Sequence, residues 1–273
     1  MTADSCVDLN SDMGEGFGAW RMGDDAAMLD IVSSANLACG FHAGDPVIMA
    51  DTAGLARDKG VAIGAHPAFL DLWGFGRRRI SGDSPADIEK MVAYQIGALQ
   101  GVAALAGHRV SHVKPHGALY NMAAADPELA GAIARAIRGV DAGLLFVVLP
   151  GSEMERAGRE AGLRVACEVF ADRGYLDDGR LAPRGQPGAL IHDPQEAARR
   201  TVEMVTTGRV RALSGRTVPV AADTICIHGD SPAAVAMARA VRIALEAAGV
   251  AIRPMHETAG GVIKLPMGAS PQT

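Results

Sequence analysis

The sequence predicts an α/β fold in which parallel strands alternate with helices, and it favours a closed barrel over an open sheet. Short aliphatic or β-branched runs are separated by helical stretches of roughly 10–20 residues, the spacing of repeated βα units. Hydrophobic residues make up 49% of the chain and aromatic residues only 4%, which suits helices packed on parallel strands. Polar residues follow nearly every run, and only in a barrel do all strand ends meet at one mouth. We therefore expect a single-domain, seven-stranded α/β barrel spanning residues 1–273.

Seven segments are expected to form the parallel strands. Periodicity alone does not distinguish a closed barrel from an open doubly wound sheet, so the choice depends on the strand ends. An eighth segment, residues 250–253, is either a further strand or an edge. The seven segments are residues 7–9, 35–38, 61–64, 112–113, 144–149, 165–169 and 224–227.

Five helices are expected to begin at a capping residue followed by proline. Asp and Ser side chains accept hydrogen bonds from the first free backbone N–H groups, and proline is well tolerated at the first helical position. Asp45 could instead belong to a binding site, and both interpretations stay open. The five pairs are Asp45-Pro46, Ser84-Pro85, Asp126-Pro127, Asp193-Pro194 and Ser231-Pro232.

Charge and composition exclude several classes of partner. The formal net charge is −5, so neither nucleic acid nor an anionic membrane is expected, and a small-molecule substrate is favoured. The N-terminus has no basic and apolar regions of the secretory kind, and the most apolar run is too short to span a bilayer. Four widely spaced cysteines without a CxxC pair favour a reducing cytoplasm.

Residues 113–121, Val-Lys-Pro-His-Gly-Ala-Leu-Tyr-Asn, carry the strongest local signal. Lys114 and His116 are two residues apart, so in an extended strand their side chains point to the same face. Pro115 and Gly117 indicate that this strand ends here and opens into a loop. A solvated lysine beside a packing histidine is the alternative, but similar polar groups follow the other strands.

The strand ends supply a set of candidate site residues. Because the carboxyl ends of parallel barrel strands converge, these side chains are expected to meet at one mouth. In chain order they are Asp8, Asn10, Asp12 and Glu15, then Asn36, His42 and Asp45, then His66, then Lys114, His116 and Asn121, then Glu168 and Arg173, and finally His228.

Four of the eight histidines follow different strands, which indicates a general acid/base site or a metal site. Carboxylate and imidazole groups could suit Zn²⁺, Mn²⁺ or Mg²⁺, although a local ligand motif such as HExxH is absent. If a divalent metal is bound, the expected ligands are Asp8, His42, His66 and His116.

Two further motifs bear on phosphate and carboxylate binding. The nucleotide-binding pattern GxxxxGK[ST] is absent from the sequence. The basic run that begins at Arg77 could hold phosphate or carboxylate oxygens through its guanidinium groups. A solvated surface turn is the alternative interpretation of this run.

Taken together, these stretches resemble the LamB/YcsF family. The likeness covers about residues 5–256 without a visible gap, and its motifs follow the family's order. The matching motifs are residues 8–15 (DLNSDMGE), 36–45 with the core ACGFHAGD, 64–67 (GAHP), 74–78 (GFGRR), 113–121, 168–175 (EVFADRGY) and 228–230 (HGD).

The resemblance implies a distorted (β/α)₇ barrel of the glycoside hydrolase/deacetylase type, located in the cytoplasm. It also implies an ATP-dependent 5-oxoprolinase that opens the lactam of 5-oxo-L-proline to L-glutamate and acts with separate 5-oxoprolinase subunits B and C. ATP would be a co-substrate. A lactam amide is a poor electrophile, and turning its oxygen into a phosphate ester would make ring opening easier.

The strand-end residues can be given roles in such a reaction. His116 is expected to be the general acid/base, with Asp8 or Asp12 orienting it or activating water and Glu15 in the same catalytic group. Lys114 would stabilise an oxyanion or phosphoryl oxygen. Substrate or nucleotide contacts are expected from Asn10, Asn36, His42, Asp45, His66, Arg77, Asn121, Glu168, Arg173 and His228, with Arg77 or Arg173 receiving the substrate carboxylate.

Two other functions stay open at this point. The same histidines and carboxylates could serve a metal-dependent deacetylase or amidohydrolase that acts without ATP. The chain could also be a non-catalytic subunit that binds a lactam and presents it to its partners.

Overall fold

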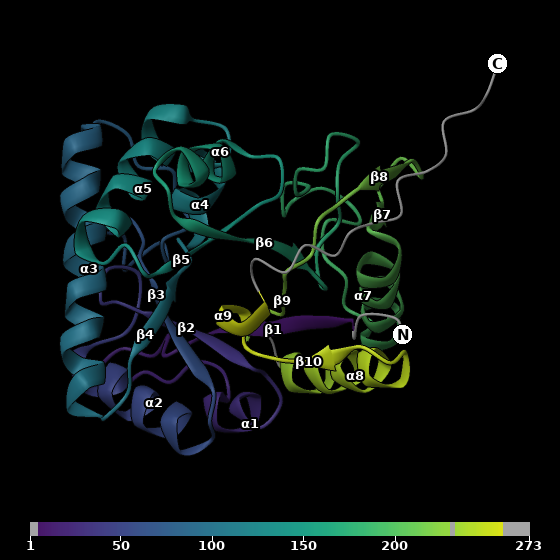
Figure 1. The fold of residues 1–273 in the computed structure, drawn as a ribbon, viewed down its shortest axis with the longest axis horizontal. Helices are drawn as coiled ribbons and strands as arrows, with labels where there is room; N and C mark the ends of the chain where they lie inside the picture. The colour runs from purple at the N-terminus through teal and green to yellow at the C-terminus, as the bar shows by residue number, and fades with distance from the viewer. Residues whose placement is uncertain (1–4, 230–232, 259–273) are drawn as a thin grey trace.

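The seven predicted strands form a closed parallel barrel. The computed structural model describes residues 5–229 and 233–258, and Figure 1 shows the sheet surrounded by helices. Each strand pairs in parallel with the next in the order β1-β2-β3-β4-β5-β6-β9, and β9 pairs with β1 to close the ring. The barrel strands are β1 (Cys6–Met13), β2 (Ser34–Ala38), β3 (Ala62–His66), β4 (Val110–Val113), β5 (Leu145–Val148), β6 (Arg164–Phe170) and β9 (Thr224–Cys226). The predicted fold class is confirmed.

Three further strands of the described residues lie outside the ring. Within residues 5–229 and 233–258, β10 (Ala251–Ile252) pairs only with the start of β1, at Cys6 and Val7, so the eighth predicted segment is an edge strand. β7 (Arg209–Arg211) and β8 (Thr217–Pro219) form an antiparallel pair that was not predicted. Both strands of this pair are only three residues long, with too few alternating positions for a strand signal.

The first strand is longer than the sequence predicted. Residues 7–9 were expected, whereas β1 runs from Cys6 to Met13 with nearly every residue buried. The polar residues in its second half suggested a loop, but their side chains are enclosed by neighbouring strands. In the barrel interior, polar side chains can satisfy one another, so polarity does not mark the end of this strand.

Figure 1 shows helices around the outside of the barrel, except the last short helix, whose Met255 packs against Leu145, Val147 and Ala166 of the strands. Four predicted caps are confirmed: the side chains of Asp45, Ser84, Asp126 and Asp193 accept hydrogen bonds from the first turn of the following helix. The fifth predicted start, Ser231-Pro232, lies outside the described residues. The helices are α1 (Asp25–Leu29), α2 (Pro46–Asp58), α3 (Pro85–Leu105), α4 (Gly117–Ala123), α5 (Pro127–Val140), α6 (Glu153–Glu160), α7 (Pro194–Thr207), α8 (Ala234–Ala247) and α9 (Met255–Thr258).

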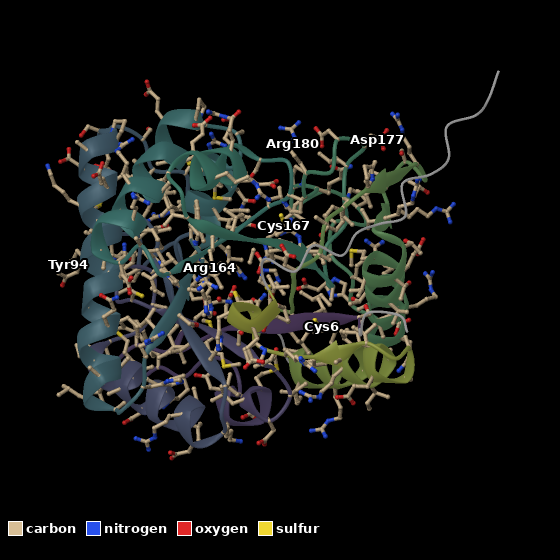
Figure 2. All side chains as sticks on the ribbon, in the orientation of Figure 1. Cys6, Tyr94, Arg164, Cys167, Asp177 and Arg180 are labelled. Carbon is tan, nitrogen blue, oxygen red and sulfur yellow. The ribbon has the colours of Figure 1, made fainter. Side chains whose placement is uncertain are left out.

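The apolar core lies between the helices and the sheet. Ile96 and Leu99 of α3 and Ile133 of α5 are fully buried, whereas Tyr94 points outward from α3 (Figure 2). In the described part of the chain, no helix is both long enough and apolar enough to cross a membrane.

Candidate active site

A pocket of about 510 Å³ opens at the carboxyl ends of the strands. Its inner wall is formed by four of the predicted site residues, Asp12, His66, Lys114 and His116, together with Tyr120. Its rim is strongly basic, because five arginines line it. These are Arg77, Arg79, Arg173, Arg180 and Arg184. Such a rim favours an anionic ligand.

Lys114 lies at the centre of the inner wall and is buried. Its Nζ is 2.9 Å from Asp12 Oδ1 and 2.8 Å from Glu168 Oε1, and it also donates to Cys226 Sγ at 3.0 Å. Burial disfavours the charged amine and would lower the pKa of Lys114. Neighbouring acidic groups, Asp12 foremost, favour the charged amine more strongly, so the pKa of Lys114 is held well above its ordinary value. The side chain is therefore a fixed cation.

Asp12 couples this cation to the neighbouring histidines. Its Oδ2 is 3.3 Å from His66 Nε2, while Oδ1 contacts Lys114. Burial alone would raise the pKa of the Asp12 carboxyl, but His66 and Lys114 lower it well below its ordinary value. Asp12 is therefore ionised and is better suited to hold its neighbours than to accept a proton.

Two asparagines form a polar layer beside the lysine. Asn10 donates to Glu168 Oε1 at 3.1 Å and accepts from Asn36 at 2.7 Å. Asn36 also donates to Asp12 Oδ1 at 3.0 Å and contacts His112 Nε2 through its own Oδ1 at 3.0 Å. The predicted residues Asn10, Asn36 and Glu168 are thus brought together as supports of the inner wall.

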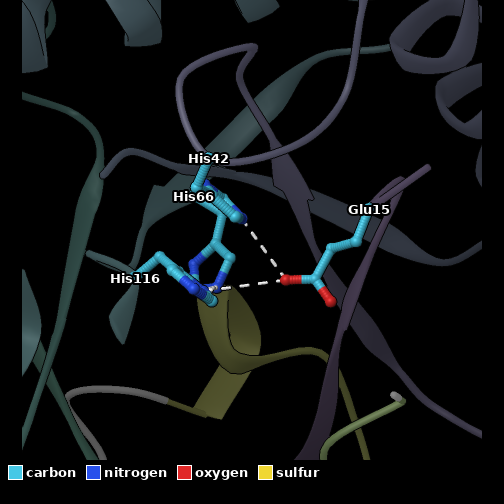
Figure 3. A group of neighbouring side chains, drawn as sticks. All are labelled: Glu15, His42, His66 and His116. Carbon is cyan, nitrogen blue, oxygen red and sulfur yellow. Dashed lines mark hydrogen bonds and ion pairs between the residues drawn. The ribbon is translucent and has the colours of Figure 1, made fainter. Parts of the chain in front are cut away.

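Three predicted histidines and Glu15 form one buried group, which we call the histidine cluster: Glu15, His42, His66 and His116 (Figure 3). His42 and His116 stack with ring centroids 3.8 Å apart. Glu15 Oε1 lies 3.3 Å from His42 Nε2 and 3.6 Å from His116 Nδ1, and His66 Nε2 lies 3.0 Å from His116 Nδ1. One candidate ligand atom from each residue lies within 4.8 Å of the others.

Burial keeps two of these rings neutral. It lowers the pKa of both His42 and His116 well below the ordinary value, and a neighbouring imidazole lowers each further: His66 for His42, and His42 for His116. Neutral imidazole presents a lone pair, which is the form that binds a metal or accepts a proton.

A strained turn holds the cluster in place. Phe75 has a positive φ of 53°, which is rare for a bulky residue. Its carbonyl accepts a hydrogen bond from His116 Nε2 at 2.8 Å, and its ring packs edge-on against His42 and His116. Gly76 follows with φ +62°, and a Cβ there would come within 2.7 Å of His116. The turn is therefore fitted to the histidine rings.

Asp8 lies away from the histidine cluster, which corrects the expectation that it binds metal or orients His116. It sits near the start of β1, where Ser34 Oγ donates to its Oδ1 at 2.6 Å and Thr224 Oγ1 donates to its Oδ2 at 2.5 Å. Burial raises the pKa of Asp8 to about 6, although these hydrogen bonds oppose the shift. Asp8 and Asp12 point to the same face of β1, but barrel strands extend several residues below the mouth. Asp8 therefore lies deeper in the barrel than Asp12.

Three residues that were expected to bind substrate or nucleotide make contacts within the protein. They are Asp45, Asn121 and Arg173. Asp45 caps α2 by accepting from Val47 and Ile48, which favours the capping interpretation. Asn121 lies at the pocket but donates to Gly117 O at 2.8 Å. Arg173 donates to two backbone carbonyls of the loop after β6, those of Ala182 and Ala189. That loop also carries Asp177 and Arg180, labelled in Figure 2.

His228 lines the pocket and is paired with Asp172, a contact that the sequence did not predict. Its Nδ1 is 2.6 Å from Asp172 Oδ2, and its Nε2 is 3.3 Å from Arg184 Nη2. Burial would raise the pKa of Asp172, but the neighbouring His228 lowers it below the ordinary value. An ionised carboxylate that orients an imidazole is the arrangement used in proton transfer.

Three further residues were missed. His112 lies two residues before Lys114 in β4, and the same parity argument would have placed it inside the barrel; burial lowers its pKa to about 3. Cys226 contacts Lys114, and Tyr120 lines the pocket beside Glu168. Apolar neighbours in the sequence made these two residues resemble ordinary core positions.

Comparison with known proteins identifies close relatives. The LamB/YcsF family model matches residues 7–260. A protein from Rhodopseudomonas palustris strain BisB18, named as the A subunit of 5-oxoprolinase, is 58% identical over 255 residues, covering 93% of this chain and 99% of the relative. The crystal structure of a lactam utilization protein from Thermus thermophilus superposes with a TM-score of 0.87 at 53% identity, covering 91% of this chain and 99% of that one.

A more distant likeness concerns the fold alone. A deacetylase solved with its substrate matches with a TM-score of 0.51 at 15% identity, covering 93% of this chain and 90% of that one. The barrel type expected from the sequence is therefore found in the structure.

Proposed function

The chain belongs to the LamB/YcsF family, and from this premise we propose that it is the A subunit of a multi-subunit, ATP-dependent 5-oxoprolinase. The reaction is the opening of the lactam of 5-oxo-L-proline to L-glutamate. The observation that carries the proposal is the match to relatives of that name along nearly the whole chain. The matched region, residues 7–260, includes every strand that supplies a side chain to the pocket.

Ring opening adds one water molecule across the lactam C–N bond, and ATP hydrolysis to ADP and phosphate consumes a second. The lactam carbonyl must be made more electrophilic, the attacking water must lose a proton, and the ring nitrogen must gain one. ATP is proposed as the co-substrate of the complete complex. The pocket is proposed to provide for the three steps at the lactam.

Lys114 is proposed to stabilise the negative oxygen that forms when the carbonyl is attacked. Its ammonium group is buried, fixed between Asp12 and Glu168, and exposed to the pocket on one side. A preorganised cation requires little rearrangement as the charge develops. The same geometry would serve a phosphoryl oxygen.

Proton transfer is proposed for the histidines on two sides of the pocket. His116, the general acid/base expected from the sequence, lines the pocket with His66 and belongs to the cluster proposed to activate the water. His228, oriented by Asp172, lines the pocket as well and is proposed to protonate the departing ring nitrogen. His228 is thereby added to the expected catalytic group.

The basic rim is proposed to receive the substrate carboxylate. Arg77 lies 4.9 Å over the Phe75 ring and lines the pocket next to His116. Arg173 is less suited because it holds the backbone of the loop after β6. Subunits B and C are the proposed partners. A cytoplasmic location is also proposed and is consistent with the four free thiols.

The test is the release of ADP and glutamate from ATP and 5-oxoproline. The chain is assayed alone and then with the B and C subunits, as wild type, His116→Ala and His192→Ala. His192 is exposed and outside the pocket, so it controls for the loss of one histidine. We expect turnover only in the complete mixture, abolished in His116→Ala and unchanged in His192→Ala.

Two results would contradict the proposal. A folded and assembled mixture that releases no glutamate would exclude the reaction. Hydrolysis of an amide or acetyl substrate by the chain alone, without ATP, would instead support the deacetylase or amidohydrolase alternative.

A further inference from the structure

The hydrogen bonds of His66 and His116 fix which nitrogen of each ring carries a proton. His66 Nδ1 lies 2.6 Å from the carbonyl oxygen of Lys114, and His116 Nε2 lies 2.8 Å from that of Phe75. A carbonyl oxygen only accepts hydrogen bonds, so each of these nitrogens must donate. In neutral rings the other two nitrogens, His66 Nε2 and His116 Nδ1, therefore carry lone pairs.

Those two lone-pair nitrogens face each other at 3.0 Å. While both rings are neutral, two acceptors at this distance have no proton to share. A cation bound by both nitrogens resolves the same conflict. Backbone carbonyls that fix the tautomer of a metal-binding histidine are a common feature of metal sites.

The remaining members of the histidine cluster complete a ligand set. Glu15 Oε1 is 3.6 Å from His116 Nδ1 and 3.3 Å from His42 Nε2. Ligands bonded to zinc at about 2.0–2.2 Å in a tetrahedron lie roughly 3.3–3.6 Å apart, which is close to these separations. In addition, the buried Nδ1 of His42 has no hydrogen-bond partner among the described residues.

We propose that Glu15, His42, His66 and His116 form a binding site for one divalent transition-metal ion of the Zn²⁺ class. Three imidazole nitrogens and one carboxylate oxygen match the donor types and the number that this ion prefers. A second group of potential ligands, Asp12, Cys226 and His228, does not form such a site, because Lys114 Nζ already contacts both Asp12 and Cys226.

This inference goes beyond the proposed reaction and does not depend on it. With the ion bound, His116 would be a ligand and no longer the general base, and the ion would lower the pKa of the attacking water instead. Proton transfer to the ring nitrogen would stay with His228. The set differs from the one expected from the sequence, because Glu15 replaces Asp8.

The test is metal binding by the isolated, untagged chain of residues 1–273. Bound metal is first removed from the protein with a chelator, and Zn²⁺ and Co²⁺ are then added in separate experiments. Calorimetry measures binding, elemental analysis measures the amount of bound metal, and visible absorption reports the geometry of bound Co²⁺. We expect one ion per chain and the intense visible bands of a tetrahedral Co²⁺ site. Glu15→Gln and His42→Ala should weaken binding by more than the roughly 10–100-fold typical of an outer-shell partner, and His192→Ala should not.

A second readout covers the case in which a variant does not fold. In the metal-free wild type, histidine ¹⁵N spectra should show the proton on Nδ1 of His66 and on Nε2 of His116, and Zn²⁺ should shift the other nitrogen of each ring. A folded chain that binds no stoichiometric metal would overturn the site. So would an ion that survives both cluster substitutions but is lost in His228→Ala. Glutamate release by a metal-free complex would separate this failure from failure of the proposed function.

Discussion

At the scale of single residues, Lys114 has two functions that a simple substitution would confuse. It presents a cation to the pocket, and it neutralises two buried carboxylates, Asp12 and Glu168. Removing one partner of a buried ion pair typically costs about 3–5 kcal/mol, because the other charge is left unpaired. Loss of activity alone would therefore not show that the lysine stabilises the reacting oxygen.

A double substitution separates the two functions. Lys114→Met should lower kcat by about 10²–10³, the usual effect of losing one oxyanion donor, and should also lower the thermal midpoint. Adding Glu168→Gln removes one unpaired charge, so the midpoint should partly recover while kcat stays low. Both are measured by glutamate release and by thermal unfolding. Recovery of kcat in the double variant would show that Lys114 only stabilises the fold.

Asp8 leads to a prediction about pH. Its pKa is raised from 3.8 to about 6 in the folded chain, so the folded state binds a proton more readily than the unfolded state. The stability that the wild type gains from this proton is present below about pH 4 and is lost as pH rises through 6. Asp8→Asn lacks this dependence. The free energy of unfolding of Asp8→Asn minus that of wild type should therefore be larger at pH 7.5 than at pH 5.

The size of this effect follows from the shift in the pKa of Asp8. A change of about two pKa units corresponds to roughly 3 kcal/mol at most. Thermal midpoints of Asp8→Asn, of wild type and of the exposed control Asp58→Asn are compared at the two pH values. An Asp8→Asn difference that does not change between pH 5 and 7.5 would contradict the raised pKa.

Much of the candidate site followed from parity and strand ends. The relation between Lys114 and His116 needed only the two-residue repeat of a strand, and the convergence of His42, His66 and His116 needed only the barrel. Depth within the barrel could not be predicted, because it depends on the stagger of neighbouring strands. For this reason Asp8 was placed at the mouth.

At the scale of elements, the turn that contains Phe75 and Gly76 positions the histidine cluster, and a matched pair of glycines tests this. Gly76 has φ +62° and Gly60 has φ +68°, so alanine carries a similar backbone strain at both, roughly 1–2 kcal/mol. They differ in space: a Cβ at Gly76 would lie 2.7 Å from His116 and 2.8 Å from His42, whereas nothing lies within 4 Å at Gly60.

Gly76→Ala should therefore lose activity out of proportion to stability. Displacing a catalytic group by about 1 Å can cost about 100-fold in rate, so a loss of this order is expected in Gly76→Ala and little change in Gly60→Ala. Glutamate release and thermal midpoints of both variants are the measurements. Equal activity in the two variants would mean that the turn does not position the histidines.

Element boundaries show what local sequence could and could not predict. Helix starts were accurate because an Asp or Ser cap followed by proline is a local signal, confirmed at Asp45, Ser84, Asp126 and Asp193. The end of β1 was missed because the polar residues between Asp8 and Asp12 are satisfied by side chains from β2, β3 and β9, far away in the sequence. The pair β7 and β8 was missed because it is too short to show alternation.

At the scale of the whole molecule, the barrel closes only through contacts between the two ends of the chain. β1 pairs with β2 on one side and with β9 on the other, and β10 adds a further pairing at its start. β9 also pairs with β6. A chain that lacks the segment after residue 220 would leave β1 and β6 with open edges, and Thr224 could no longer donate to Asp8.

The prediction that residues 1–273 form one domain can be tested by removing that segment. Residues 1–220 contain six of the seven barrel strands, yet they should not fold, because an unclosed barrel exposes both its edges and the apolar faces normally covered by α8. Circular dichroism during heating and size-exclusion chromatography are compared for this fragment and the full chain. We expect a cooperative transition only in the full chain. If the fragment is monomeric and melts cooperatively, residues 221–273 are a separable unit, and the active site must be assembled without closure of the ring.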